Sequence, residues 1–113
     1  MALIAAGAAA LAVTGVAGAA KRPVKKSVKV GDNFYSPKKL TLPRNSTVVW
    51  KWLAGNGETH DVRLTRRPKR AKRFVSAPTA TNYSYEKKLT RTGRYAIICT
   101  YHENMAQSIK VVR

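Results

Sequence analysis

The sequence predicts an all-β fold, an antiparallel β-sandwich of about seven or eight short strands. Apolar and polar residues alternate in short runs after residue 26, as they do in strands that bury one face. Turn signals rich in Gly, Asn, Pro and Ser separate these runs roughly every eight to twelve residues. No stretch has a convincing helical period, and 113 residues suffice for a single domain of this kind.

Each strand is predicted from its alternation and from the residues that end it. The most apolar segment places Trp50 and Trp52 on one face. Ile97 and Cys99 share a face of a later, nearly continuous apolar run, which suits a central strand. Pro37 restricts the segment before it to an edge strand or a bend. The predicted strands are residues 27–30, 34–35, 39–42, 47–53, 60–64, 83–89, 95–100 and 106–112, with a surface loop from residue 66 to about residue 80.

The first 20 residues carry no charged side chain and consist mostly of Ala, Gly, Leu and Val. They end in small residues suited to an A-x-A-like cleavage and are followed by Lys21 and Arg22, which predicts a secretory signal peptide. A retained N-terminal membrane anchor is the alternative. We therefore predict three parts: residues 1–20 as signal peptide or anchor, residues 21–26 as a basic linker, and residues 27–113 as one domain exported to the periplasm, the cell envelope or the medium.

The remainder of the chain is strongly basic. Its 22 Lys and Arg against 5 Asp and Glu give a net charge of +17, which favours acidic partners or anionic surfaces. The densest cluster lies between residues 66 and 73, and it can be either a docking surface or a solvated loop without a dedicated partner. Its basic residues are Arg66, Arg67, Lys69, Arg70, Lys72 and Arg73.

Residues 99–105 hold the most distinctive chemistry of the chain. They include the only cysteine, Cys99, together with His102 and Met105. Thiolate, imidazole and thioether donors suit copper, which blue-copper sites bind through two His, one Cys and a weak axial Met. The second His would be His60, 39 residues before Cys99. The alternative is that each residue is structural, as a lone buried Cys usually is.

The single cysteine also bears on the metal. It cannot form an internal disulfide, and an unpaired thiol in an exported protein needs burial, intermolecular pairing or a metal; a metal explains it best here. Asp61 follows His60, and Thr100 follows Cys99, so these neighbours should meet if the two loops meet at a metal. We predict a hydrogen bond from Thr100 to the Asp61 carboxylate that supports the site. The alternative is an exposed Asp61 that offsets Arg63.

Several motifs resemble the cupredoxins, a family of small blue copper proteins that includes plastocyanin, pseudoazurin and amicyanin. The resemblance covers about residues 26–113, and the Cys-x2-His-x2-Met spacing is most similar to that of amicyanin. The matching segments are Gly31-Asp32-Asn33-Phe34, Ser36-Pro37, Thr47-Val48-Val49-Trp50, Thr59-His60-Asp61-Val62, Gly93-Arg94-Tyr95, and Cys99, His102 and Met105.

The resemblance implies a Greek-key β-sandwich that binds one copper ion and shuttles single electrons as the metal alternates between Cu(I) and Cu(II). It implies that Tyr95 forms a tyrosine corner that ties down a loop. The copper ligands that it implies are His60, Cys99, His102 and Met105.

The family resemblance further implies that the outer edge of His102 serves as an electron port. The chain departs from the family at Asp61, where Asn is frequent, at Tyr101, where Pro is frequent, and in its basic surface. The port should be ringed by apolar residues, for which the candidates are Ala54, Tyr101, Met105 and Ala106.

We predict a blue copper electron carrier and not an enzyme, because no paired acids, Gly-rich phosphate loop or Ser-His-Asp set is visible. A copper protein for delivery or buffering, and a metal-free basic β-sandwich that binds a polyanion, remain as alternatives. We expect a monomer whose partners are acidic redox proteins. Tyr101 and the basic run of residues 66–73 are the candidate docking residues. An anionic membrane or cell wall is a further candidate, whereas an exported protein is not expected to meet nucleic acid.

Overall fold

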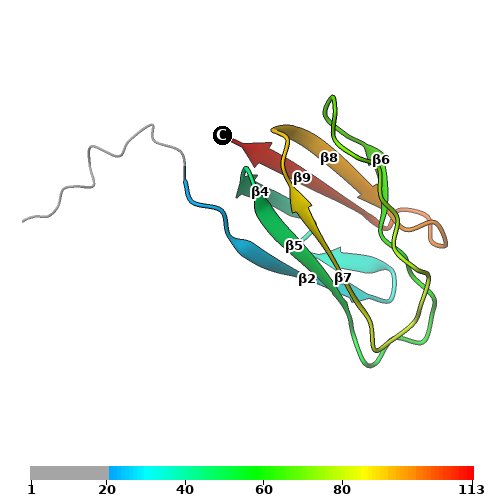
Figure 1. Ribbon diagram of the computed structural model, residues 1–113. Helices are drawn as coiled ribbons and strands as arrows, with labels where there is room; N and C mark the ends of the chain where they lie inside the picture. The colour runs from blue at the N-terminus through cyan, green and yellow to red at the C-terminus, as the bar shows by residue number, and fades with distance from the viewer. Residues whose placement is uncertain (1–20) are drawn as a thin grey trace, which may run out of the picture.

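The structure, a computed structural model, describes residues 21–113 and forms a β-sandwich of two four-stranded sheets (Figure 1). The predicted sandwich is therefore confirmed, and the described residues contain no helix. The predicted signal peptide lies outside these residues. The strands are β2 (Lys25–Gly31), β3 (Phe34–Ser36), β4 (Lys39–Pro43), β5 (Ser46–Trp52), β6 (Arg63–Arg66), β7 (Ser84–Leu89), β8 (Gly93–Ile98) and β9 (Ala106–Val112).

Strand direction differs from the prediction in each sheet. The strand orders are β3-β2-β5-β7 and β4-β9-β8-β6. The pairs β2·β5 and β4·β9 are parallel, whereas the other pairs are antiparallel. The prediction of a wholly antiparallel sandwich was wrong on this point. Apolar alternation reports which face of a strand is buried and carries no information on the direction of its neighbour.

The strand predicted at residues 60–64 begins later, at Arg63. His60 forms only an isolated bridge with Thr79, and its carbonyl accepts a hydrogen bond from the Trp52 indole (3.2 Å). The predicted inward face is nevertheless correct, because His60, Val62 and Leu64 are at most 5% exposed. The backbone at His60 is thus held by loops and a side chain instead of by a sheet.

The core between the sheets is closed by buried polar contacts as well as by apolar packing. The Trp50 indole of β5 donates to the Gln107 side chain of β9 (2.8 Å), and the Gln107 amide donates to the Pro37 carbonyl (2.8 Å). The Tyr95 hydroxyl donates to the Arg91 carbonyl (2.8 Å), which is the expected tyrosine corner. These contacts join the two sheets and fix the turn before β8.

The two ends of the sandwich are built from different loops. At one end, the loop between β8 and β9 meets the segment after β5, and the Cys99 amide donates to the Met105 carbonyl (3.0 Å). At the opposite end, the Arg44 amide donates to the Val112 carbonyl (2.7 Å). Figure 1 shows the β8–β9 loop at the far end of β8 from the chain's C-terminus. In residues 21–113, no helix is long and apolar enough to cross a membrane.

Candidate metal centre

Three predicted ligands come together at the first of these ends. One ligand atom from each of His60, Cys99 and His102 lies within 4.8 Å of the others. Cys99 directly follows β8, His102 belongs to the loop that leads to β9, and His60 follows the β5 loop. His60 is 0% and Cys99 4% exposed, whereas the His102 side chain is 21% exposed. The centre is therefore buried on the protein side and open at a single imidazole.

The His60 imidazole is held with one nitrogen free. Its Nε2 lies 2.8 Å from Asp32 Oδ1, which accepts its hydrogen. Its Nδ1 is buried and has no hydrogen-bond partner in the described part of the chain. A buried polar atom without a partner is unfavourable by roughly 1–3 kcal/mol. A metal ion bound at Nδ1 would satisfy it, so the residue fits a metal ligand better than a structural histidine.

Asp32 is a supporting residue that the sequence reasoning missed. Its carboxylate also accepts hydrogen bonds from the amides of Gly57 (2.9 Å) and Glu58 (3.2 Å). The Gly57 amide and then the His60 ring hold the pKa of Asp32 below its usual value. The segment was interpreted only as a turn, and the one available signal was its place in a motif shared with the cupredoxins. A carboxylate on the remote nitrogen of a ligating histidine orients the ring.

The loop that carries His102 is closed on itself. The Met105 amide donates to the His102 carbonyl (3.5 Å), and Asn104 adopts a positive φ of 66°, which Asn tolerates. Met105 is 2% exposed and belongs to the core cluster that includes Cys99. Its assignment to an exposed apolar ring was therefore wrong, because its backbone pairs with Cys99 and its side chain faces inward. Among the other ring candidates, Tyr101 is 52% exposed, Ala54 is exposed and Ala106 is half-buried.

The predicted contact between the two ligand loops is present. The Asp61 carboxylate accepts from the Thr100 amide through Oδ1 and from the Thr100 hydroxyl through Oδ2, both at 2.7 Å. The Tyr35 hydroxyl donates to the Asp61 carbonyl (2.5 Å). Asp61 is only 4% exposed, so the alternative of an exposed residue that offsets Arg63 was wrong. These bonds tie the residue after His60 to the residue after Cys99.

Acidic side chains surround the exposed edge of the metal centre at His102. His102 Nε2 lies 3.0 Å from the Thr59 carbonyl and 3.4 Å from Glu58 Oε1. The rings of His60 and His102 are 4.8 Å apart between centroids. Glu103 follows His102 and is exposed. The solvent side of His102 thus carries negative charge on an otherwise basic protein.

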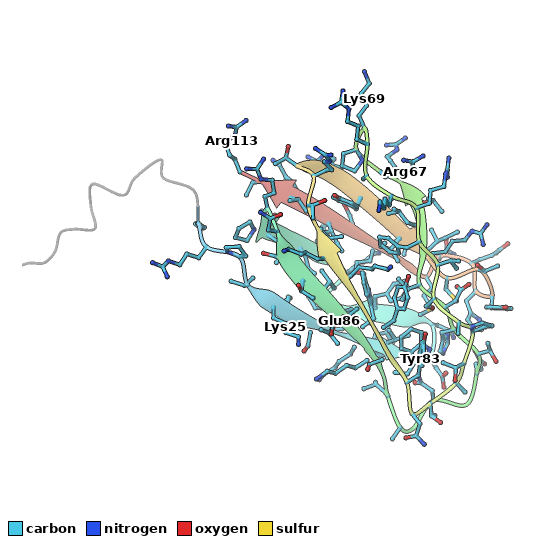
Figure 2. All side chains as sticks on the ribbon, viewed as in Figure 1. Lys25, Arg67, Lys69, Tyr83, Glu86 and Arg113 are labelled. Carbon is cyan, nitrogen blue, oxygen red and sulfur yellow. The ribbon has the colours of Figure 1, made fainter. Side chains whose placement is uncertain are left out.

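The basic run of residues 66–73 leads away from the centre. Arg66 pairs with Ala96 of β8, and Pro68 lies against Gly93, where an added Cβ would come within 2.9 Å of the proline ring. Gly93 precedes Cys99 by six residues, or about 20 Å of extended strand. Figure 2 shows Arg67 and Lys69 on the loop at this remote end. The structure does not bring this run to the metal centre.

No family model matches the chain, and no curated protein matches it. Solved structures do match. A pseudoazurin from Sinorhizobium meliloti has a TM-score of 0.68 at 18% identity, over 80% of this chain and 75% of that chain. A purple cupredoxin from Nitrosopumilus maritimus has a TM-score of 0.64 at 21% identity, over 77% and 99%. A copper-containing nitrite reductase from Thermus scotoductus SA-01 has a TM-score of 0.64 at 26% identity, over 81% of this chain and only 23% of that chain.

The structure thus combines a β-sandwich with a His-Cys-His cluster at one end. The described chain has the fold of the pseudoazurin and of the purple cupredoxin. Within that fold His60, Cys99 and His102 are positioned to form a copper site.

Proposed function

We propose that this protein is an exported mononuclear blue copper protein that carries single electrons between redox partners. The observation that carries the proposal is the grouping of His60, Cys99 and His102 within 4.8 Å at one end of a cupredoxin sandwich. The free Nδ1 of His60 and the chemistry of the donors favour copper over harder metals.

The ligand roles follow from the position of each residue. Cys99 binds as a thiolate, since a coordinating thiol loses its proton to the metal, and its buried site excludes water. Asp32 orients His60, and Asp61 fixes the spacing of the two ligand loops. Met105, buried and joined to Cys99 by a backbone hydrogen bond, would supply a fourth, thioether donor. Bound copper would supply a one-electron couple between Cu(I) and Cu(II).

The route for the electron follows from exposure. Among the three grouped ligands, only His102 reaches solvent to an appreciable degree. The His102 ring therefore offers an electron the shortest path between solvent and the bound metal. The exposed Tyr101 beside it is a candidate contact for a redox partner. A rigid, largely buried ligand set also limits rearrangement when the metal changes charge.

The first experiment is reconstitution of purified protein with Cu(II). An intense visible thiolate-to-copper band and reversible one-electron cycling are expected. Copper delivery or buffering would use the same ligands, and rapid exchange of copper with a chelator, without reversible cycling, would favour it. The matching nitrite reductase is much longer than this chain, and we propose electron transfer without enzymatic turnover.

A further inference from the structure

We propose that the end of the sandwich opposite the metal centre is a docking surface for a bilayer of anionic phospholipids. This surface, the basic end, is defined by exposed residues of three connections and of the end of β7: Arg44, Arg70, Lys72, Lys88 and Arg91. Only the consequence for copper rests on the proposed function, because lipid binding itself requires no metal.

Charge is divided unevenly between the two ends. Four of the five carboxylate side chains lie at the metal end, where Asp32 and Asp61 bond to the ligand loops and Glu58 and Glu103 flank His102. The fifth, Glu86, lies 3.8 Å from Lys25. Apart from Glu86, no acidic side chain balances the basic end. A molecule with this asymmetry is oriented as well as attracted by an anionic surface.

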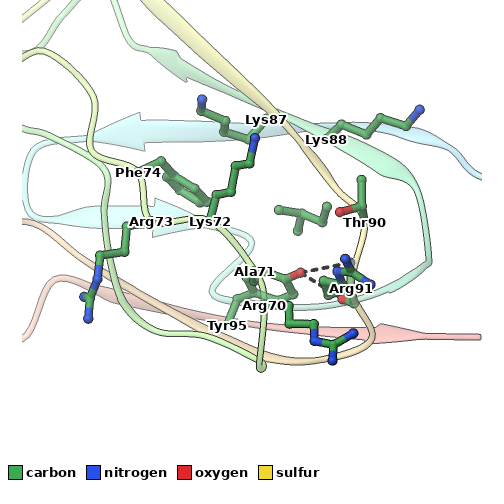
Figure 3. A pocket seen from close by; sticks show the side chains of 11 residues that line it. Arg70, Ala71, Lys72, Arg73, Phe74, Lys87, Lys88, Thr90, Arg91 and Tyr95 are labelled. Atoms are coloured by element: carbon green, nitrogen blue, oxygen red, sulfur yellow. Dashed lines mark hydrogen bonds between the residues drawn. The ribbon is translucent and has the colours of Figure 1, made fainter.

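A pocket of about 310 Å³ opens within the basic end (Figure 3). It lies between residues 70–74 and residues 87–91, with the Phe74 ring and the Thr90 hydroxyl in its lining. Its volume is about ten times the roughly 30 Å³ that a water molecule occupies in the liquid, so it has room for a phosphate group. The basic residues around it are Arg70, Lys72, Arg73, Lys87, Lys88 and Arg91.

Most of this charge is free to meet an external anion. Among residues 21–113, Lys25 is the only Lys or Arg with a carboxylate within 4.0 Å. Lys87 is partly engaged, because its Nζ lies 5.5 Å from the Tyr85 ring centroid and 5.9 Å from that of Phe74. Unpaired Lys and Arg side chains around a pocket suit phosphate, which they bind through charge-assisted hydrogen bonds.

The path of the chain favours lipid over other polyanions. The Thr47 amide donates to the Val24 carbonyl (2.9 Å), and β2 pairs from Lys25 with the start of β5, so the chain enters the sandwich at the basic end. The 20 residues before Lys21 contain no charge and are mostly apolar. Nucleic acid or an acidic protein would match the basic residues alone. An anionic bilayer matches both the basic residues and the apolar sequence that leads into them.

The consequence concerns orientation. If the basic end lies on the bilayer, the length of β8 separates the surface from Cys99, and His102 faces away from the lipid. The copper port would then remain open to a soluble redox partner while the protein is held at the membrane.

The test measures partition of the full chain onto vesicles of phosphatidylglycerol mixed with phosphatidylcholine, and onto vesicles of phosphatidylcholine alone. One variant removes four charges from the basic end: Arg70→Gln, Lys72→Gln, Lys88→Gln and Arg91→Gln. A matched control removes four exposed charges elsewhere: Lys29→Gln, Lys38→Gln, Lys39→Gln and Lys51→Gln. Thermal unfolding checks that both variants are folded.

The basic-end variant should lose affinity for the anionic vesicles by a factor on the order of 10³, since each of the four basic residues near such a surface contributes about fivefold. The control should lose no more than about threefold at 0.15 M salt, because its charges lie farther from the lipid than the screening length of about 8 Å. Equal losses in both variants would mean that net charge alone acts, and would overturn the proposal. Equal binding to neutral and anionic vesicles would also overturn it.

Acetylation of lysines on the unmodified chain provides a second readout that needs no variant. Anionic vesicles should protect Lys72 and Lys88, while Lys29 and Lys51 stay reactive. Protection of Lys29 and Lys51 instead would overturn the proposed orientation. Tight binding to duplex DNA without binding to anionic vesicles would assign the surface to nucleic acid and overturn the choice of lipid. These vesicle and acetylation results do not depend on copper. If the protein shows no copper band, the proposed electron-transfer function fails, but the test of lipid binding is unaffected.

Discussion

Replacement of Asp61 by Ala tests how the two ligand loops are held together. The substitution removes both 2.7 Å hydrogen bonds to Thr100, one from its amide and one from its hydroxyl. Hydrogen bonds to a charged group contribute about 1.5–3 kcal/mol each. Thr100 is exposed, so water can replace part of the loss. We expect the free energy of unfolding to fall by about 2–3 kcal/mol in total.

The effect on the metal site should be larger than the effect on stability alone suggests. Removal of a residue that supports a metal ligand weakens metal affinity by about 10–100-fold. Asp61→Asn is the matched variant, because its Oδ1 can still accept from the Thr100 amide and its Nδ2 can donate to the hydroxyl. This variant should keep at least half of the stability that Asp61→Ala loses, and most of the affinity for copper. Glu86→Ala, at an exposed carboxylate, controls for loss of one negative charge.

The measurements are thermal unfolding of the metal-free protein and competitive titration with a copper chelator. For a domain of this size, 1 kcal/mol corresponds to about 4–8 °C in Tm, so Asp61→Ala should lower Tm by at least about 8 °C. If Asp61→Ala binds copper as tightly as the parent protein, then the bridge between the loops does not support the site and the reasoning fails.

Other substitutions should have distinct outcomes. Met105→Leu should keep copper and change the free energy of unfolding by less than about 1.5 kcal/mol, because the two side chains have similar volume. Voltammetry should show a higher reduction potential. Complete loss of copper would mean that Met105 is more than an axial ligand. Tyr95→Phe removes the bond to the Arg91 carbonyl and should lower the free energy of unfolding by about 1 kcal/mol, and denaturant titration with no shift of midpoint would contradict a structural role for the corner. Burial raises the pKa of Tyr35 above its ordinary value of 10.0, and burial also raises the pKa of Tyr95. A pKa that is higher in the folded state adds stability that is intact below the unfolded-state pKa and is lost above it. The free energy of unfolding measured against pH should therefore decline from near pH 10, and Tyr35→Phe should reduce that decline.

The grouping of His60, Cys99 and His102 could be predicted from the sequence because the chemistry of the candidate ligands is local. Cys99, His102 and Met105 lie within seven residues, and the chain has only one other histidine. The Thr100–Asp61 contact followed from the same logic, since residues that adjoin two ligands must lie close if the ligands do. Each of these inferences depends on residue type and chain adjacency alone.

Features that depend on tertiary packing were not predictable in this way. Asp32 lies 28 residues from His60, and its only signal in the sequence is its place in a motif shared with the cupredoxins. The inward position of Met105 depends on the pairing of its carbonyl with Cys99, which residue type does not reveal. The two parallel strand pairs likewise arise from the order in which the chain crosses between sheets.

The most direct test of the copper assignment is the visible spectrum of the protein after addition of Cu(II), measured together with Cys99→Ser. The parent protein should take up one copper ion and show an intense thiolate-to-copper band, and the variant should lack that band because a hydroxyl does not supply the soft thiolate donor. Absence of the band in the parent protein, or an identical spectrum in the Cys99→Ser variant, would contradict a blue copper centre at His60, Cys99 and His102.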